Sequence, residues 1–262
     1  MIIKNFKEIK KIRIASNLAA KVLEMIEKYI KPGITTEELD NICNFYIVKK
    51  QKAIPACLKY KGFPKSICIS INDTVCHGIP KKEKIKNGDI INIDVTILKN
   101  GFYSDTSKMF LVGKQNNLNK LLCNITQQSL YLSIYKIKPG IKLNIIGNTI
   151  EKFIKFKKKF SIVKKYCGHG IGINFHELPQ ILHFKNNNIN NIILKKGMIF
   201  TIEPIINLGK NKVFTLKDGW TVKTKDKSLS AQYEHTILVT SNGCEIMTLR
   251  KDEFIPKIII NK

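Results

Sequence analysis

The sequence predicts an α+β fold in which two similar halves pack about a pseudo-twofold axis, with antiparallel sheet at the centre and helices outside. Three observations lead to this prediction: a β-hairpin at 91–107, an internal repeat, and helical segments that alternate with hairpins rather than with single parallel strands. No Pro-, Gly- or Ser-rich linker separates the halves. We therefore expect one domain over residues 1–262, with halves at about 6–117 and 118–252.

The first predicted element is an amphipathic helix near residues 9–26, where apolar residues recur at helical spacing. The tetrapeptide KPGI follows at 31–34. Thr35 and Glu38 then form the capping-box pattern that begins a helix, so a second helix is expected directly after this tetrapeptide.

The segment INIDVTILKNGFYSDTS at 91–107 predicts a hairpin, because apolar and polar residues alternate and Asn100-Gly101 is a strong turn signal. A turn centred on this pair places Asp105 opposite Thr96, whereas a shift of one residue places it opposite Asp94. Both registers put the two aspartates on one face. Since like charges on one face destabilise a sheet, two interpretations remain: a solvated polar face or a bound cation.

The second half repeats the first. A helix is predicted near 118–136, and KPGI recurs at 138–141, an offset of 107 residues, before another helical stretch at 143–156. NGDIINID at 87–94 is echoed by KGMIFTIE at 196–203, an offset of 109 residues. A repeat of this length indicates two similar halves rather than a solenoid.

Equivalent strands of two such halves meet near the axis. Asp94 and Glu203 occupy matching positions in the two echoed segments, each predicted on a strand, so we expect their carboxylates to converge. The Asn-rich stretch at 186–191 is expected to be a surface loop.

A net charge of +25 has two interpretations. It is typical of nucleic-acid binding. However, the lysines are scattered, arginine occurs only at Arg13 and Arg250, and the excess accompanies abundant Ile and Asn, which favours compositional drift in an AT-rich genome. A diffuse attraction to RNA, such as the ribosome surface, stays open under either interpretation.

Seven cysteines without a C-x-x-C pair favour reduced thiols over a disulfide framework or a zinc ribbon. No run of eighteen apolar residues predicts a membrane span, and the first residues lack the features of a signal peptide. We therefore expect a cytoplasmic protein with no membrane association.

Further candidate ligands lie in the second half. YCGHGIGINFHELP at 166–179 places His169 between two glycines, which allow close backbone approach, and His176 follows. Glu234 begins an apolar segment, where an unpaired carboxylate is costly. Taken singly, His169 is better interpreted as a structural histidine, and Glu234 is equally well interpreted as a surface glutamate on an edge strand.

Together, these motifs closely resemble those of the type I methionine aminopeptidases, and the resemblance covers nearly the whole chain. It implies the pita-bread fold and a metal-dependent hydrolase. The matching segments are IRIASNLAAKVLEMI, KYKGFPKSICISINDTVCHGIP, NIDVTILKNGFYSDTSKMFLVG, YCGHGIGINFHELP, GMIFTIEP and KDGWTVKTKDKSLSAQYEHTILVT.

The resemblance implies five metal ligands, all of the required type: Asp94, Asp105, His169, Glu203 and Glu234. Asp94 and Glu234 would bridge two divalent ions, Asp105 would bind one, and His169 and Glu203 the other. Four carboxylates and one imidazole suit Co, Mn or Fe, and cellular availability rather than the sequence selects among them. Such a pair of ions can hold a bridging hydroxide that attacks the first peptide carbonyl.

The same resemblance assigns the remaining site residues. Glu203 would also carry the proton from the nucleophilic water to the leaving amine, His77 would contact the amide nitrogen, and His176 would stabilise the oxyanion. An apolar pocket would hold the methionine side chain of the substrate. That pocket would be lined by Cys57, Tyr60, Phe63, Cys68, His77, Phe175 and Trp220.

Three departures from the family pattern lie near this pocket: Lys61 in place of a common histidine, Phe63 in place of a tyrosine, and Ile173-Asn174 in place of Arg-Gly. Lys61 could weaken support of the transition state, but none of these changes touches a predicted ligand. The spacing of Glu203 and Glu234 leaves no room for the insertion of type II relatives.

We therefore expect a monomeric aminopeptidase that removes the initiator methionine from nascent chains when the second residue is small. Two alternatives remain. One is a peptidase of the same fold that cleaves before proline, which Xaa-Pro peptides would separate. The other is a binding protein that has lost catalysis and uses its basic surface on RNA, which a metal-dependent peptidase assay would separate.

Overall fold

The computed structural model describes residues 3–186, 192–251, 253 and 255. Four α-helices occur in these residues: α1 (Phe6–Glu27), α2 (Thr36–Phe45), α3 (Asn117–Ile134) and α4 (Ile145–Lys155). The strands are β1 (Ile54–Pro55), β2 (Cys68–Ile71), β3 (Thr74–Cys76), β4 (Ile90–Lys99), β5 (Phe102–Leu111), β6 (Ser161–Ile162), β7 (Gly168–Gly170), β8 (Glu177–Ile181), β9 (Ile199–Ile202), β10 (Ile205–Asn207), β11 (Val213–Thr215), β12 (Val222–Thr224), β13 (Ser230–Gln232), β14 (His235–Val239) and β15 (Cys244–Ile246). Short π-helical and 3-10 turns lie at Tyr46–Lys50 and Tyr60–Gly62.

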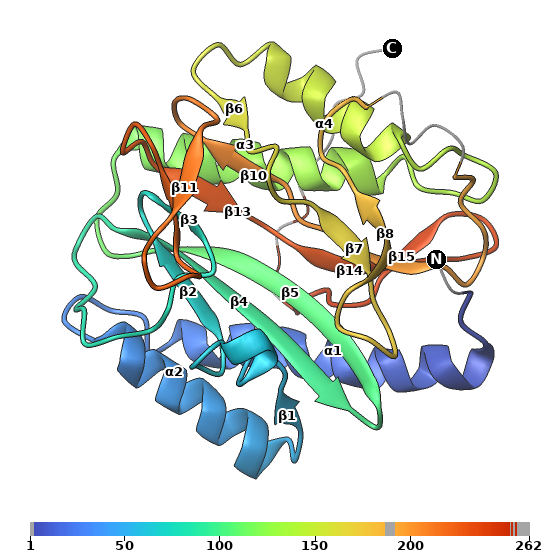
Figure 1. The fold of residues 1–262 in the computed structure, drawn as a ribbon, viewed down its shortest axis with the longest axis horizontal. Helices are drawn as coiled ribbons and strands as arrows, with labels where there is room; N and C mark the ends of the chain where they lie inside the picture. The colour runs from blue at the N-terminus through green and yellow to red at the C-terminus, as the bar shows by residue number, and fades with distance from the viewer. Residues whose placement is uncertain (1–2, 187–191, 252, 254, 256–262) are drawn as a thin grey trace.

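The strands lie between two pairs of helices. In Figure 1, α1 and α2 cover one side of the strands, and α3 and α4 cover the opposite side. Each pair comes from one half of the chain, so the α+β architecture with outer helices is confirmed.

The starts of two predicted helices, α1 and α2, are stabilised by side-chain caps. Asn5 and Thr35 are the N-cap residues of α1 and α2, and each forms a reciprocal capping box with a glutamate, Glu8 and Glu38 respectively. The helices predicted near 118–136 and 143–156 are α3 and α4.

The predicted hairpin is β4 and β5, and its register is the first of the two alternatives. Lys99 pairs with Phe102 across the turn, and Thr96 pairs with Asp105. Asn100 and Gly101 have φ values of 53° and 79°, the left-handed conformation that the twist of a two-residue hairpin requires. Asp94 and Asp105 therefore lie diagonally on one face.

Two larger antiparallel sheets meet at the centre. One has β4 between β1 and β2, with β5 also paired to β4, and the other has the order β15-β14-β9-β7-β8. An isolated bridge between Ser107 and Glu234 joins them. Smaller sheets, β13-β10-β6 and β11-β12-β3, lie beside them. The bridge brings strands of the two halves into contact next to Asp105.

The apolar core is divided into clusters. One cluster packs α1 and α2 against β4, with Leu23 and Ile93 fully buried. Another packs α3 and α4 against β9 and β10, with Ile150 fully buried, and also includes Ile90 and Met109 from β4 and β5. Such burial is the main term that stabilises a domain.

Two details differ from the sequence prediction or lie beyond it. Glu203 does not lie on a strand but in the two-residue break between β9 and β10, because Pro204, which has no N–H to donate, follows it. Of the Asn-rich 186–191 loop, only Asn186 lies within the described residues. Among those residues, no helix combines the length and apolar character that crossing a bilayer needs.

Candidate active site

The predicted site residues come together around one cavity of about 350 Å³ between the two halves. Each of the thirteen residues predicted as ligand, catalytic group or pocket wall lines it. They are Cys57, Tyr60, Phe63, Cys68, His77, Asp94, Asp105, His169, Phe175, His176, Glu203, Trp220 and Glu234. The geometry thus gathers groups that are up to 177 residues apart in the chain.

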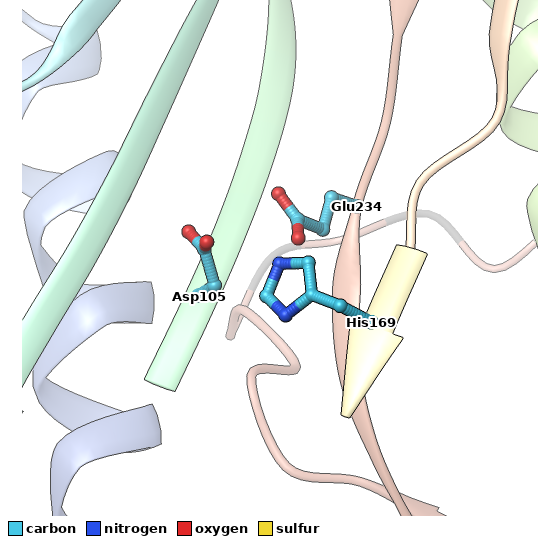
Figure 2. Close-up of side chains that lie close together, drawn as sticks. All are labelled: Asp105, His169 and Glu234. Carbon is cyan, nitrogen blue, oxygen red and sulfur yellow. The ribbon is translucent and has the colours of Figure 1, made fainter. Parts of the chain in front are cut away.

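Three of these groups face one another from three strands. Asp105 comes from β5, His169 from β7, and Glu234 immediately precedes β14 (Figure 2). One ligand atom from each lies within 4.8 Å of the others. Glu234 is 1% exposed, so the interpretation as a surface edge-strand glutamate is wrong.

The fourth carboxylate, Glu203, lies next to this trio. Its Oε1 is 3.7 Å from His169 Nε2. Thr201 Oγ1 donates to Glu203 Oε1 at 2.8 Å, and Gln232 Nε2 donates to Oε2 at 3.2 Å. The Glu203 N–H donates to His183 Nε2 at 3.1 Å, so both the side chain and the backbone of Glu203 are held.

Burial dominates the electrostatics of the carboxylates. It raises the pKa of Asp94 to about 6 and that of Glu203 to about 8, and it raises the pKa values of Asp105 and Glu234 well above their usual range. Repulsion among the four carboxylates adds to this effect at Asp105, Glu203 and Glu234. The site therefore favours either protons or a counter-charge.

The unpaired atoms favour a bound cation. Asp94 Oδ1 and Glu234 Oε1 are buried and have no hydrogen-bond partner. In the described part of the chain, no lysine or arginine forms an ion pair with any of the four carboxylates. Since orphaned buried oxygens are costly, this donor set fits divalent metal ions.

The two candidate histidines are oriented differently. His169 Nδ1 lies 3.0 Å from the Gly170 carbonyl oxygen, which can only accept, so Nδ1 carries the proton and Nε2 has a free lone pair toward the carboxylates. His176 Nδ1 lies 2.8 Å from the Tyr60 hydroxyl. The pKa of His176 is lowered to about 3, mainly by burial and further by the nearby His169 and Lys61. Its ring is therefore neutral near pH 7.

His77 also lines the cavity. Its ring contacts Tyr166 edge-on, with centroids 5.4 Å apart, and Trp220, with centroids 6.2 Å apart. Burial lowers its pKa to about 4, so this imidazole is also neutral near pH 7. It has φ 53°, a strained value for a residue other than glycine that recurs at functional sites.

An apolar pocket adjoins the carboxylates. Cys57, Cys68, Phe63 and Phe175 form one buried cluster, against which Tyr60 and Trp220 pack. Within it, Phe63 meets Trp220 edge-on at 5.2 Å between centroids, and Tyr60 meets Phe175 at 4.6 Å. Sulfur and aromatic faces of this kind suit an unbranched, polarisable side chain such as methionine.

The structure adds residues that the sequence did not single out. Thr201 and Gln232 hold Glu203, and His183 accepts the hydrogen bond of its backbone N–H. Thr96 Oγ1 donates to Asp105 Oδ1 at 2.9 Å. Only Thr96 could have been found beforehand, because the predicted hairpin register placed it opposite Asp105.

The comparisons with known proteins decide the family. The model of metallopeptidase family M24 matches residues 10–241. The chain belongs to metallopeptidase family M24. This membership, together with the cluster of Asp105, His169 and Glu234, supports a metal-dependent peptide hydrolase.

Within this family the chain is similar to bacterial methionine aminopeptidases. It is 61% identical to the methionine aminopeptidase of Escherichia coli K12 over 98% of this chain and 97% of that protein. It is 60% identical to the methionine aminopeptidase of Buchnera aphidicola from Acyrthosiphon pisum, over 99% and 98% of the two chains. The crystal structure of methionine aminopeptidase from Rickettsia prowazekii superposes with a TM-score of 0.92 at 48% identity, covering 95% of this chain and all of that one. The predicted family resemblance and fold are confirmed.

Proposed function

We propose that this M24 metallopeptidase removes the N-terminal methionine from nascent proteins whose second residue is small. The observation that carries this proposal is the juxtaposition of four carboxylates and His169 with a sulfur- and aromatic-lined pocket in one cavity. The high identity to methionine aminopeptidases over nearly full length supports the same activity.

Two divalent ions would be held by five side chains. These side chains would be Asp94, Asp105, His169, Glu203 and Glu234. Four carboxylates would balance the charge of two such ions, and the buried oxygens of Asp94 and Glu234 that have no hydrogen-bond partner support cation binding. When bound, the ions supply Lewis-acid polarisation of the scissile carbonyl and lower the pKa of water. Co, Mn and Fe all suit this donor set.

Glu203 would transfer the proton. Its carboxylate is fixed by Thr201 and Gln232, which hold it beside His169 without neutralising it. A carboxylate held in this way can accept a proton from the attacking water and return it to the leaving amine.

The neutral histidines would act as donors to the substrate. If the Tyr60 hydroxyl donates to His176 Nδ1, the proton of the ring stays on Nε2, where it can stabilise the developing oxyanion. His77 would contact the nitrogen of the scissile amide, and its ring is held by contacts with Tyr166 and Trp220.

The remaining predictions are part of the same proposal. The whole chain would form one catalytic domain of two similar halves, about 6–117 and 118–252. The apolar cluster that joins α3 and α4 to Ile90 and Met109 of the first half supports a single domain. It would act as a cytoplasmic monomer on nascent N-termini. Its net charge of +25 would favour contact with the ribosome surface.

Hydrolysis of Met-Ala-Ser tests the activity. We expect the parent protein to release methionine when Mn²⁺ or Co²⁺ is present, and to leave an Ala-Pro peptide uncut. A variant carrying Asp94→Ala and Glu203→Ala should not release methionine. Equal cleavage by this variant and the parent would overturn the assignment, and preferential cleavage of the Xaa-Pro peptide would favour the other kind of M24 activity.

A further inference from the structure

A buried ion pair lies outside the cavity and ties the start of the chain to the turn that carries part of the site. Lys4 Nζ lies 3.0 Å from Glu177 Oε1 and 2.8 Å from Oε2. The Lys4 side chain is 0% exposed and that of Glu177 is 5% exposed. Two charges taken out of water in this way are retained only with close pairing and further hydrogen bonds.

Glu177 in turn organises the backbone of the preceding turn. Its Oε1 accepts the N–H of Ile173 at 2.9 Å and that of Asn174 at 3.2 Å. These residues belong to the segment between β7, which ends just after His169, and β8, which begins at Glu177. Phe175 and His176 lie on that segment, so one carboxylate fixes the turn on which both are mounted.

Lys4 itself is held from two directions. Its backbone N–H donates to the Gly197 carbonyl oxygen at 2.9 Å, and Ile3 forms a bridge with Met198 at the start of β9. Its ammonium lies so close to Gly172 that a Cβ added there would be 2.5 Å from Lys4 Nζ. The lysine therefore supports the turn by direct packing as well as by charge.

We propose that Lys4 is a positioning residue for the reaction: through Glu177 it fixes the turn that carries His176 at the substrate. This inference rests on the proposed function. Without the ammonium, the Glu177 carboxylate would turn toward water and release the two N–H groups that it holds. His176 would then lose its fixed distance to the scissile carbonyl, although Lys4 touches neither substrate nor metal ligand.

A double-mutant cycle with His176 tests this role. We would measure kcat and KM for Met-Ala-Ser with saturating Mn²⁺ in the parent, Lys4→Met, His176→Ala and the combined variant. Misplacement of a catalytic group by about 1 Å costs about 10²-fold, so Lys4→Met should lower kcat by about 10- to 100-fold in the parent. In the His176→Ala background the same change should lower kcat by less than about threefold, because its target is already missing.

Arg13→Met is the matched control, because it removes another long-range ion pair, Arg13–Glu245, from the N-terminal helix. That pair is exposed, with side chains 44% and 34% accessible, and we expect its loss to leave kcat unchanged. Should Lys4→Met fail to fold, Glu177→Ala takes its place in the cycle with the same expectations, since it removes the oxygen that accepts the N–H groups of Ile173 and Asn174.

The outcomes separate the two proposals. A parent that does not release methionine refutes the proposed function, and this inference with it. A parent that is active while Lys4→Met keeps kcat within tenfold refutes the positioning role alone. An equal loss in both backgrounds, which a general structural defect would produce, also overturns it.

Discussion

The metal-free protein should lose stability as the pH rises from 7 to 9, and Glu203 should account for a measurable part of that loss. Burial raises the pKa of Glu203 to about 8 in the folded protein, above the value of 4.5 for an unperturbed glutamate. Between pH 7 and 9 the folded state therefore holds a proton that the unfolded state has already released. Stability falls wherever the folded state binds more protons, so the sign is a decrease with rising pH.

The magnitude follows from that pKa. Integrating the difference in bound protons between pH 7 and 9 gives about 1 kcal/mol from Glu203 alone. For a chain of this size, a change of this order shifts Tm by about 2 to 4 °C. Below pH 7 the histidines act in the opposite direction, because burial lowers the pKa values of His77 and His169 to about 4.

The assay is thermal unfolding by circular dichroism in EDTA at pH 7, 8 and 9. Glu203→Gln is the matched control, because it keeps the size of the side chain and cannot titrate. Buried thiols such as Cys43 contribute in the same direction in both proteins and cancel in the comparison. Equal pH slopes for the parent and Glu203→Gln would refute the reasoning, as would a slope that saturating Mn²⁺ leaves unchanged in the parent.

Three further predictions concern residues of the site. His176→Ala should lower kcat on Met-Ala-Ser by about 10² to 10³-fold with little change in KM, as loss of an oxyanion donor does. A change in KM alone, measured by steady-state kinetics, would contradict this role. Thr201→Val removes a hydrogen bond that lowers the pKa of Glu203 in the metal-free protein, so in EDTA its Tm should fall more between pH 7 and 9 than that of the parent; an equal or smaller fall contradicts it. Phe63→Ala should weaken the preference for methionine over alanine at the first position of the peptide substrate by about tenfold. The measurement is the ratio of kcat/KM for the two substrates. An unchanged ratio would mean that Phe63 does not line the methionine pocket.

Much of the site could be predicted because the relevant signals are local. Alternation and the Asn100-Gly101 turn predict the hairpin, which places Asp94 and Asp105 on one face in either register. The structure shows that the diagonal register is the one formed. The internal repeat then predicts that the equivalent segment of the second half approaches the same axis. Both inferences depend on spacing along the chain, which a sequence displays directly.

What could not be predicted depends on contacts between distant segments. His183 supports Glu203 from 20 residues away, and Lys4 reaches Glu177 across 173 residues. A lysine near the start of a chain with 45 basic residues carries no local sign that it is buried. Glu203 was expected on a strand because the echoed segments are similar. However, Pro204 cannot donate a backbone hydrogen bond, and β9 ends at Ile202, just before Glu203.

Anomalous diffraction from crystals grown with Mn²⁺ tests the proposed metal centre most directly. The centre would consist of two divalent ions held by Asp94, Asp105, His169, Glu203 and Glu234. We expect two Mn²⁺ peaks inside the cavity, with Asp94 and Glu234 contacting both, Asp105 contacting one, and His169 and Glu203 the other. A map in which Mn²⁺ lies elsewhere, or in which these side chains bind no ion at saturating Mn²⁺, would contradict the proposed metal centre and the activity built on it.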